Sequence, residues 1–257
     1  MKKLLSVILV FLMVTGCMSV TSFADDNSAT VYVSISNKGQ LVAAQTKVTV
    51  ADIDGDNVLT VNDALYAAHE AAYSGGAKNG YSYYTHKDYG LSIGKLWGDT
   101  SGNFGYYINN SSCWSLADTV KNGDYLNAFV YSDGKNYSDK YCWFDNYTVT
   151  ADANSEIELT LRSAGYDAGW NPVTLPVANA EITVDGNSTG VKTDANGKAT
   201  IQISGAGKHI ISAVSASETL VPPVCTAQIN GGIFASVISA ITSFFSAIIN
   251  FFLSIFA

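Results

Sequence analysis

The stretch that decides the fold reads Asp52-Ile53-Asp54-Gly55-Asp56-Asn57-Val58-Leu59-Thr60-Val61-Asn62-Asp63. Counted as a twelve-residue loop, it has acidic residues at positions 1, 3, 5 and 12, which is the spacing of an EF-hand calcium loop. Calcium takes about six to eight oxygen ligands, and alternate residues of a tightly curled loop point toward one centre. The sequence therefore predicts a Ca²⁺ site. Its expected ligands are the side chains of Asp52, Asp54, Asp56, Thr60 and Asp63 and the backbone carbonyl of Val58.

Two positions of this loop depart from the usual pattern. Asn57 stands at position 6, where Gly normally allows the sharp turn, but Asn tolerates a left-handed backbone better than other residues with a side chain. Asp63 stands at position 12 in place of Glu, and its shorter side chain reaches a metal less well with both oxygens. The alternative interpretation is a solvated acidic turn that binds no metal.

Composition limits the class of protein. The 257 residues are 47% hydrophobic and only 14% charged, with 15 Tyr and 22 Gly, and the net charge is -8. Low charge and many aromatic residues favour a β-rich secreted protein over a cytoplasmic enzyme. The negative charge excludes electrostatic binding to nucleic acid.

Residues 1–24 are predicted to be a secretory signal peptide. A charged start precedes an apolar run over residues 4–14, and Ser22-Phe23-Ala24 offers a cleavage site between small residues. A second interpretation stays open, because Val14-Thr15-Gly16-Cys17 resembles a bacterial lipobox in which Cys17 carries lipid. Either interpretation places the mature protein outside the cytoplasm, in the extracellular space or on the cell surface.

Three further cysteines, Cys113, Cys142 and Cys225, cannot all pair with one another. Buried free thiols and a bridge between Cys113 and Cys142 are both compatible with the sequence. The chain has no CxxC motif, and its three His residues lack the spacing of zinc ligands.

The segments around the acidic loop predict an α+β domain. Residues 29–36 and 45–50 read as strands joined through a turn, and residues 61–73 read as a helix with an apolar face. Thr60 and Asp63 form a variant of the capping box that starts such a helix. The aromatic part that follows predicts strands at residues 81–84, 104–108, 125–131 and 141–149. A hairpin, a crossing helix and further strands indicate an arrangement of the β-grasp type.

Four short motifs carry a resemblance to a known family: Phe104-Gly105-Tyr106-Tyr107-Ile108-Asn109-Asn110, Leu116-Ala117-Asp118, Lys121-Asn122-Gly123-Asp124-Tyr125 and Thr60-Val61-Asn62-Asp63-Ala64-Leu65. Together they resemble the family of domains similar to the transcobalamin C-terminal domain, over roughly residues 30–132. The resemblance implies a β-grasp-like fold of secreted or surface proteins from Gram-positive bacteria. In transcobalamin the domain helps to enclose cobalamin, so the resemblance also implies a small-ligand binder. The acidic loop resembles a single dockerin repeat, whereas dockerins carry two.

A second domain is predicted over residues 149–230. Strands are expected at residues 157–161, 180–184, 198–203 and 209–214, and Pro222-Pro223 is expected to end the module. One segment of this domain resembles the Ig-like or carboxypeptidase-regulatory-like β-sandwiches of bacterial surface proteins. It reads Lys192-Thr193-Asp194-Ala195-Asn196-Gly197-Lys198-Ala199-Thr200.

Residues 231–257 are predicted to form a hydrophobic helix, since no charged residue occurs from Ile233 to Ala257. A helix of this length could span a hydrocarbon core of about 30 Å. Three interpretations stay open: a membrane anchor, a self-associating helix, and a helix docked on the protein itself.

The sequence as a whole predicts a mainly β protein whose N-terminal domain, residues 29–148, is α+β and carries the calcium loop. No catalytic motif occurs, so we expect a non-enzymatic calcium-binding or adhesion module with an unknown protein or glycan partner. The alternative is a small-ligand binder for cobalamin or a glycan, and a hydrolase has least support. Aromatic residues that favour a ligand surface, although most could equally be core, are Tyr84, Trp97, Tyr106, Tyr107 and Trp114.

Overall fold

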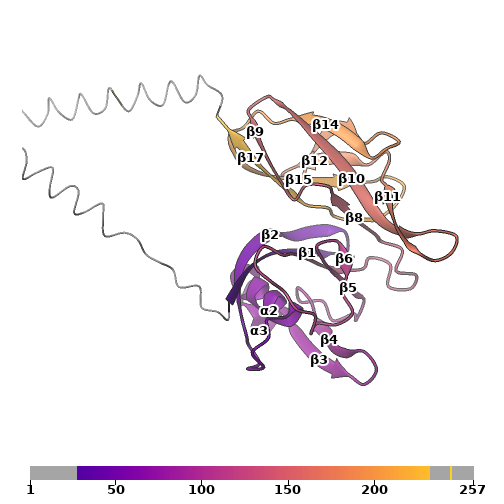
Figure 1. Ribbon diagram of the computed structural model, residues 1–257. Helices are drawn as coiled ribbons and strands as arrows, with labels where there is room; N and C mark the ends of the chain where they lie inside the picture. Colours follow the sequence, from indigo (N-terminus) through magenta and orange to yellow (C-terminus); the bar gives the residue numbers. More distant parts are fainter. Residues whose placement is uncertain (1–27, 232–243, 245–257) are drawn as a thin grey trace, which may run out of the picture.

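The computed structural model describes residues 28–231 and Phe244. This part of the chain is mainly β and forms two units, an α+β unit drawn in indigo to magenta and a β unit drawn in pink to yellow (Figure 1). The predicted signal peptide, the predicted lipobox cysteine Cys17 and nearly all of the predicted hydrophobic helix 231–257 lie outside the described residues. Within residues 28–231 no helix combines the length and apolar composition that crossing a bilayer requires.

The first unit is built on a five-stranded sheet with the order β2-β1-β7-β5-β6. Its strands are β1 (Ser28–Asn37), β2 (Gln40–Ala51), β5 (Phe104–Ile108), β6 (Ser111–Ser112) and β7 (Tyr125–Val130). β1 and β7 run parallel, while the other neighbours are antiparallel. The expected strands at residues 29–36, 104–108 and 125–131 are confirmed. β2 begins at Gln40 rather than Gln45, because a left-handed residue at Gln45 (φ 43°) and register shifts in the pairing interrupt the simple alternation.

The helix α2 (Val61–Ala72) follows β2 and packs against the sheet. Its buried apolar residues recur at helical spacing and share one core with the inner residues of β1. The capping box is confirmed, because Thr60 Oγ1 accepts from Asp63 N (3.4 Å) and Asp63 Oδ2 accepts from Thr60 N (2.7 Å). A short helix α3 (Ala77–Gly80) then leads to a separate hairpin of β3 (Ser82–His86) and β4 (Gly90–Lys95). The expected order of hairpin, crossing helix and further strands is therefore present.

The second unit is a β-sandwich of two five-stranded sheets. One sheet contains β8 (Lys140–Phe144), β10 (Glu156–Tyr166), β11 (Pro172–Pro176), β14 (Lys198–Gln202) and β16 (Leu220–Val221). The other contains β9 (Thr148–Asp152), β12 (Glu181–Val184), β13 (Asn187–Lys192), β15 (Gly207–Val214) and β17 (Cys225–Asn230). Buried residues of both sheets meet in one core, which makes the sandwich a single folding unit.

Two boundaries drawn from the sequence are wrong. The run 141–149, expected as the last strand of the first domain, is two strands, and β8 pairs with β10 and β16 of the sandwich. The first domain therefore ends before Lys140 and not at residue 148, because alternate residues of β8 (Cys142 and Phe144) belong to the sandwich core. Pro222-Pro223 does not end the second domain, since β17 follows it and pairs with both β15 and β9.

The two units meet through tyrosine rings and one glutamine. Tyr107 of β5 stacks on Tyr141 of β8 with ring centroids 3.7 Å apart, and Tyr125 of β7 stacks on Tyr147 at 3.9 Å. The buried Gln45 donates through Nε2 to the carbonyl oxygens of residues 147 (2.8 Å) and 224 (3.2 Å). Interlocked rings and buried amide bonds fix how the units lie against each other.

The three described cysteines are all free thiols. Cys113 is half-buried in the first unit, whereas Cys142 and Cys225 are buried in the sandwich core. The interpretation of free thiols is confirmed, and the alternative bridge between Cys113 and Cys142 is not present.

Candidate calcium site

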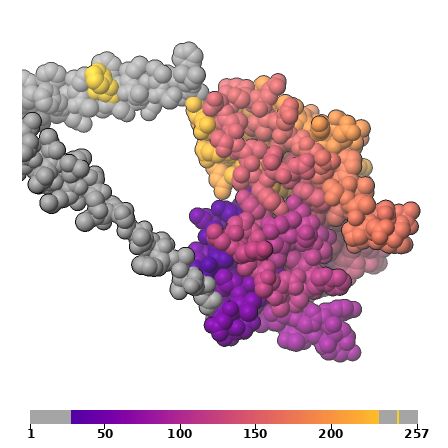
Figure 2. Space-filling model, viewed as in Figure 1, coloured from indigo at the N-terminus to yellow at the C-terminus, as the bar shows by residue number. Residues whose placement is uncertain are grey.

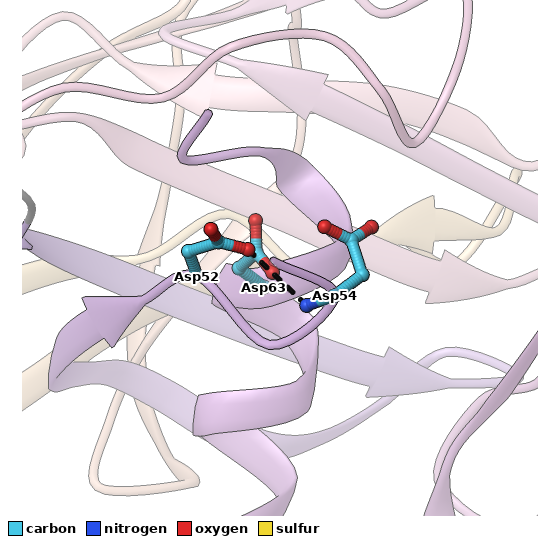
Figure 3. A group of neighbouring side chains, drawn as sticks. All are labelled: Asp52, Asp54 and Asp63. Carbon is cyan, nitrogen blue, oxygen red and sulfur yellow. Dashed lines mark hydrogen bonds between the residues drawn. The ribbon is translucent and has the colours of Figure 1, made fainter. Parts of the chain in front are cut away.

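The acidic loop joins the end of β2 to the start of α2. The carboxylates of Asp52, Asp54 and Asp63 each offer an oxygen, and these oxygens lie within 4.8 Å of one another. Figure 3 shows the three side chains gathered at this turn, where the chain leaves the strand and enters the helix. Among the described residues, these three therefore form a group compact enough to bind one ion.

Asp52 shapes the loop from its first position. Its Oδ1 accepts a hydrogen bond from Gly55 N (2.7 Å) and its Oδ2 accepts one from Asn57 N (2.8 Å). Asn57 has a φ of 64°, so the expectation that it adopts the left-handed turn is confirmed. These bonds stabilise the charged carboxylate, and the one from Asn57 contributes most to lowering the pKa of Asp52.

Asp63 closes the loop from the first turn of α2 and is almost fully buried. Its Oδ1 accepts from Ile53 N (3.0 Å), while its Oδ2 accepts from Thr60 N (2.7 Å) and from the Thr60 hydroxyl (2.6 Å). A carboxylate has about four lone-pair positions, of which these bonds take three. Asp63 can therefore give an ion one oxygen, Oδ1, rather than the pair of oxygens that position 12 usually supplies.

Asp54 is the exposed member of the group. The pKa of Asp54 is raised, first by loss of hydration within the loop and then by the negative charge of the neighbouring Asp56. A carboxylate that is harder to ionise beside other carboxylates shows mutual repulsion, which a bound cation would relieve. The electrostatics of Asp54 therefore suit a cation at this position.

The other three expected ligands, Asp56, Val58 and Thr60, do not belong to this group of carboxylates, although the Thr60 hydroxyl lies 2.6 Å from Asp63 Oδ2. Asp56 is exposed and its Oδ1 accepts from Val58 N (2.8 Å), which holds the next part of the turn. The Thr60 hydroxyl is committed to Asp63, and the Val58 side chain is exposed. Of the four expected carboxylate ligands, the structure thus brings together Asp52, Asp54 and Asp63.

A segment distant in sequence fixes the exit of the loop. Val120 N donates to the carbonyl oxygen of Leu59 (2.9 Å), and Val61 N donates to that of Asp118 (2.9 Å). Asn62 N donates to the carbonyl oxygen of Leu116 (3.0 Å), so the segment 116–120 satisfies early N–H groups of α2 that no helical turn can reach. Sequence analysis missed this support, because its only local signal is a turn-rich stretch. The loop is held at both ends before any ion binds.

The donor set fits a hard divalent cation. Asp52, Asp54 and Asp63 supply oxygen and no nitrogen or sulfur, and together they carry three negative charges when ionised. These three residues would hold the ion, which would supply charge compensation at the strand–helix junction.

The five aromatic residues expected to form a ligand surface do not gather in one place. Tyr84 and Trp114 are exposed, with 50% and 92% of their surface accessible. Trp97 and Tyr106 pack against the core of the first unit, and burial raises the pKa of Tyr106 to about 12. Tyr107 lies on the opposite face of β5 from its neighbour and stacks against the second unit. Of these five residues, Tyr107 is thus the one that stacks on a ring of the second unit.

His69 is packed inside the first unit. Its side chain is fully buried, with Nδ1 facing the carbonyl oxygen of Leu65 (2.7 Å) and Nε2 facing the N–H of Trp97 (3.0 Å). An acceptor at one nitrogen and a donor at the other specify the neutral ring with its proton on Nδ1. Burial also lowers the pKa of His69. The ring links α2 to the turn after β4.

The comparisons with known proteins give little further guidance. No protein-family model matches the chain, and no curated protein matches it. Two crystal structures of the N-terminal four Ig domains of Dscam1 match weakly. Isoform 4.44 has a TM-score of 0.24 and 11% identity, over 79% of this chain and 44% of that one. Isoform 9.44 has a TM-score of 0.21 and 11% identity, over 80% and 46%. The chain spans less than half the length of either.

Proposed function

We propose that this protein is an exported, non-catalytic binding module whose N-terminal unit is stabilised by Ca²⁺. The observation that carries the proposal is the convergence of Asp52, Asp54 and Asp63 at the junction of β2 and α2. A cation there would join the strand to the helix and remove the repulsion between the carboxylates. Extracellular Ca²⁺ is plentiful enough for a site of modest affinity, and the signal-like N-terminus supports export.

The architecture supports a module that displays surfaces. The order β2-β1-β7-β5-β6, with β1 parallel to β7 and α2 after the first hairpin, favours a β-grasp-like unit such as the transcobalamin-like family has. The sandwich that follows suits an Ig-like spacer, and the uncharged segment after it would serve as a tether. Partners of such a module would be a protein or a glycan.

Calcium binding can be tested with a matched pair of variants. Asp54→Asn keeps the size of an exposed loop residue but removes one charge from the group, so we expect it to weaken Ca²⁺ binding at least tenfold. Asp194→Asn removes an exposed carboxylate of the second unit that holds only its own turn, and it should leave Ca²⁺ affinity unchanged. Isothermal titration of the full chain with CaCl₂ measures both. Equal affinity in the wild type and Asp54→Asn, or no binding by the wild type, would refute the proposal.

A further inference from the structure

A cleft of about 600 Å³ lies where the two units meet. The first unit contributes Tyr107 and the turn from Asn110 to Ser112, and the connecting segment contributes Tyr131. The sandwich contributes β8 and the end of the β10–β11 hairpin. Figure 2 shows this hairpin, in coral to orange, projecting beyond the rest of its unit. The volume falls within the range of about 300–1,000 Å³ that is typical of small-ligand sites.

The alternation of β8 turns two aromatic side chains toward this cleft. Cys142 and Phe144 are buried in the sandwich core, so Tyr141 and Trp143 face the opposite side of the strand. Tyr141 lines the cleft floor and stacks on Tyr107, and its ring centroid is 5.7 Å from that of Trp143. Tyr141 is only 5% exposed, so it holds its neighbours in place, and the partly exposed rings of Tyr107 and Trp143 are the ones that a ligand can reach from the two units.

Further aromatic rings stand on the walls. Tyr131 is half-buried on one side, and Tyr166, with 66% of its surface accessible, stands on the hairpin. Trp170 lies at the hairpin tip with its ring centroid 6.2 Å from that of Tyr166. An exposed Tyr is common, but Tyr131, Tyr137 and Tyr166 line one concave site, and their rings offer flat apolar faces to a ligand; Trp170 is not among the lining residues.

Three of the side chains that line the cleft carry neutral hydroxyls that are free to bond a ligand. Ser111, Ser112 and Thr174 line the cleft, and within residues 28–231 their hydroxyls form no hydrogen bond to another protein group. The phenol of Tyr141 is already paired, because it donates to Asn110 Oδ1 (3.0 Å) and accepts from Asn127 Nδ2 (3.1 Å). The rim hydroxyls can therefore donate to or accept from a bound molecule.

The charged groups of the cleft are satisfied by protein partners. The buried Asp139 accepts through its two oxygens from Ser132 N (2.8 Å) and Asp133 N (3.0 Å). Lys140 forms an ion pair with Glu218. Burial raises the pKa of Tyr107 to about 12, so its phenol is neutral at physiological pH. An anionic ligand would therefore find no unpaired cation among these lining groups, and the Asp139 carboxylate is buried with both of its oxygens hydrogen-bonded.

We propose that the cleft binds a neutral oligosaccharide. A pyranose ring has an apolar face of C–H groups, which stacks on the negative face of an aromatic ring, and a rim of hydroxyls, which pairs with free hydroxyls. Rings on the floor and walls with neutral hydroxyls at the rim match both parts of a sugar. The inference rests on the proposed function as a binding module, and it names the ligand class and its place. It does not rest on the calcium site, since no residue from 54 to 63 lines the cleft.

The test uses the full chain and three probes: cellotetraose, chitotetraose and mannotetraose. Titration is followed by calorimetry and by tryptophan fluorescence, because Trp143 lies in the cleft. We expect at least one probe to bind with a Kd below about 1 mM. Tyr166→Ala and Trp143→Ala should each weaken that binding about tenfold, corresponding to the loss of one stacked ring. Melting temperatures establish that each variant is folded, and Tyr166 is exposed enough for its replacement to leave the fold intact.

Trp114→Ala is the matched control, because it removes an exposed tryptophan that lies outside the cleft. It should bind the probe as the wild type does. The proposal is overturned if none of the three probes binds at a concentration of about 10 mM, ten times the expected upper limit of the Kd. It is also overturned if Trp114→Ala weakens binding while Tyr166→Ala does not. Binding of tetramethylammonium in place of every sugar would also overturn it, since the rings would then form a cage for a cation.

Chelation separates this proposal from the calcium proposal. EDTA should leave sugar affinity unchanged, because the ion would sit in the loop and not in the cleft. If the protein binds sugar but no Ca²⁺, only the calcium proposal is refuted. If the protein binds Ca²⁺ but no sugar, only the cleft proposal is refuted.

Discussion

The two units use their loop carboxylates in opposite ways. In the first unit Asp52, Asp54 and Asp63 share one small space. In the second unit Asp167 and Asp194 each hold their own turn: Asp194, for example, accepts from the N–H groups of Asn196 and Lys198, both at 2.8 Å. A lone carboxylate surrounded by backbone donors needs no counter-ion, whereas a group of carboxylates does.

The pKa directions show the same contrast. Hydrogen bonds lower the pKa of Asp167, led by the Asn171 side chain, and that of Asp194, led by Lys198 N. The pKa of Asp54 is instead raised, through lost hydration and the charge of Asp56. The pKa of Asp52 in the same loop is also lowered, because backbone N–H groups donate to it, so Asp54 alone of these four has a raised pKa that a nearby cation would lower.

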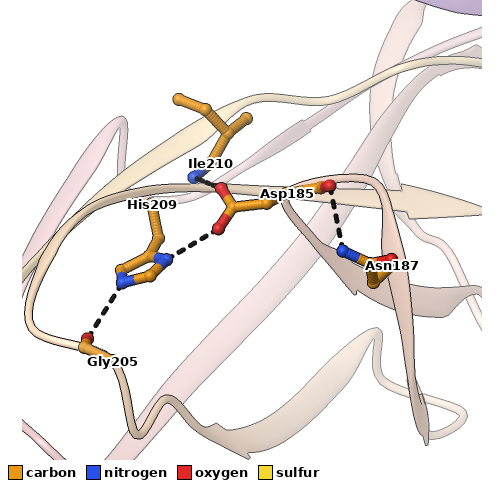
Figure 4. Close-up of polar contacts among 5 residues, drawn as sticks. All are labelled: Asp185, Asn187, Gly205, His209 and Ile210. Carbon is orange, nitrogen blue, oxygen red and sulfur yellow. Dashed lines mark hydrogen bonds and ion pairs between the residues drawn. The ribbon is translucent and has the colours of Figure 1, made fainter.

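The hydrogen-bond partners of the histidines also differ between the units, and so does the charge that they favour on the ring. His69 of the first unit lies between an acceptor and a donor, which keeps its ring neutral. His209 of the second unit faces two acceptors, Asp185 Oδ2 (2.7 Å) and the carbonyl oxygen of Gly205 (2.9 Å), which favour the charged ring (Figure 4). Asp185 Oδ1 also accepts from Ile210 N (2.8 Å), so one carboxylate joins two loops.

The largest expected effect is the response of the two units to calcium. At free Ca²⁺ about a hundredfold above the Kd, binding would stabilise the first unit by about 2.7 kcal/mol. This corresponds to a rise in Tm on the order of 10 °C for a unit of this size. Calorimetry with Ca²⁺ and with EDTA should show the full rise in the wild type and in Asp194→Asn, but at most about half of it in Asp54→Asn, because a tenfold weaker affinity leaves about 1.4 kcal/mol of stabilisation. An equal rise in all three proteins would erase the contrast between the units.

A smaller effect is expected from Asp63→Ala in the presence of EDTA. The substitution leaves the N–H groups of Ile53 and Thr60 without their acceptor, and we expect a loss of about 2 kcal/mol in the free energy of unfolding. Urea denaturation measures it. Asp54→Ala serves as control and should be near neutral in EDTA, because Asp54 is exposed and its charge is repelled by Asp56. A large loss in Asp54→Ala would show that this carboxylate holds the turn without an ion.

The smallest effect concerns pH. Burial lowers the folded-state pKa of His69, so the unfolded chain takes up its proton first and stability is lost as pH falls through about 6.5. The hydrogen bond to Asp185 raises the folded-state pKa of His209, so its contribution is full below about 6.5 and is lost as pH rises through the raised value. The two slopes therefore oppose each other in the wild type.

His209→Gln isolates the contribution of the first unit. Between about pH 5.5 and 8 its unfolding free energy should rise with pH more steeply than that of the wild type, since only the slope of His69 remains. Urea denaturation across this range provides the measurement. A flatter profile than the wild type would contradict the assignment of a charged His209 and a neutral His69.

Local patterns let the sequence determine much of the first unit by itself. The capping box of Thr60 and Asp63, the left-handed Asn57 and the start of α2 each depend on residues within a few positions. The strand β5 was placed to the residue, because its aromatic residues lie between clear turn signals. Such features follow from backbone sterics and short-range hydrogen bonds, which sequence spacing specifies.

Only the tertiary structure decided which distant elements meet. Sequence alternation shows that β8 has two faces, but not that Cys142 would enter the sandwich and Tyr141 the cleft, since both faces are apolar or aromatic. The support of the loop by segment 116–120 and the stacking of Tyr107 on Tyr141 likewise join residues many positions apart. Which strands pair and which surfaces of the two units meet depends on the total apolar area that the whole chain buries. A short sequence motif cannot specify that total.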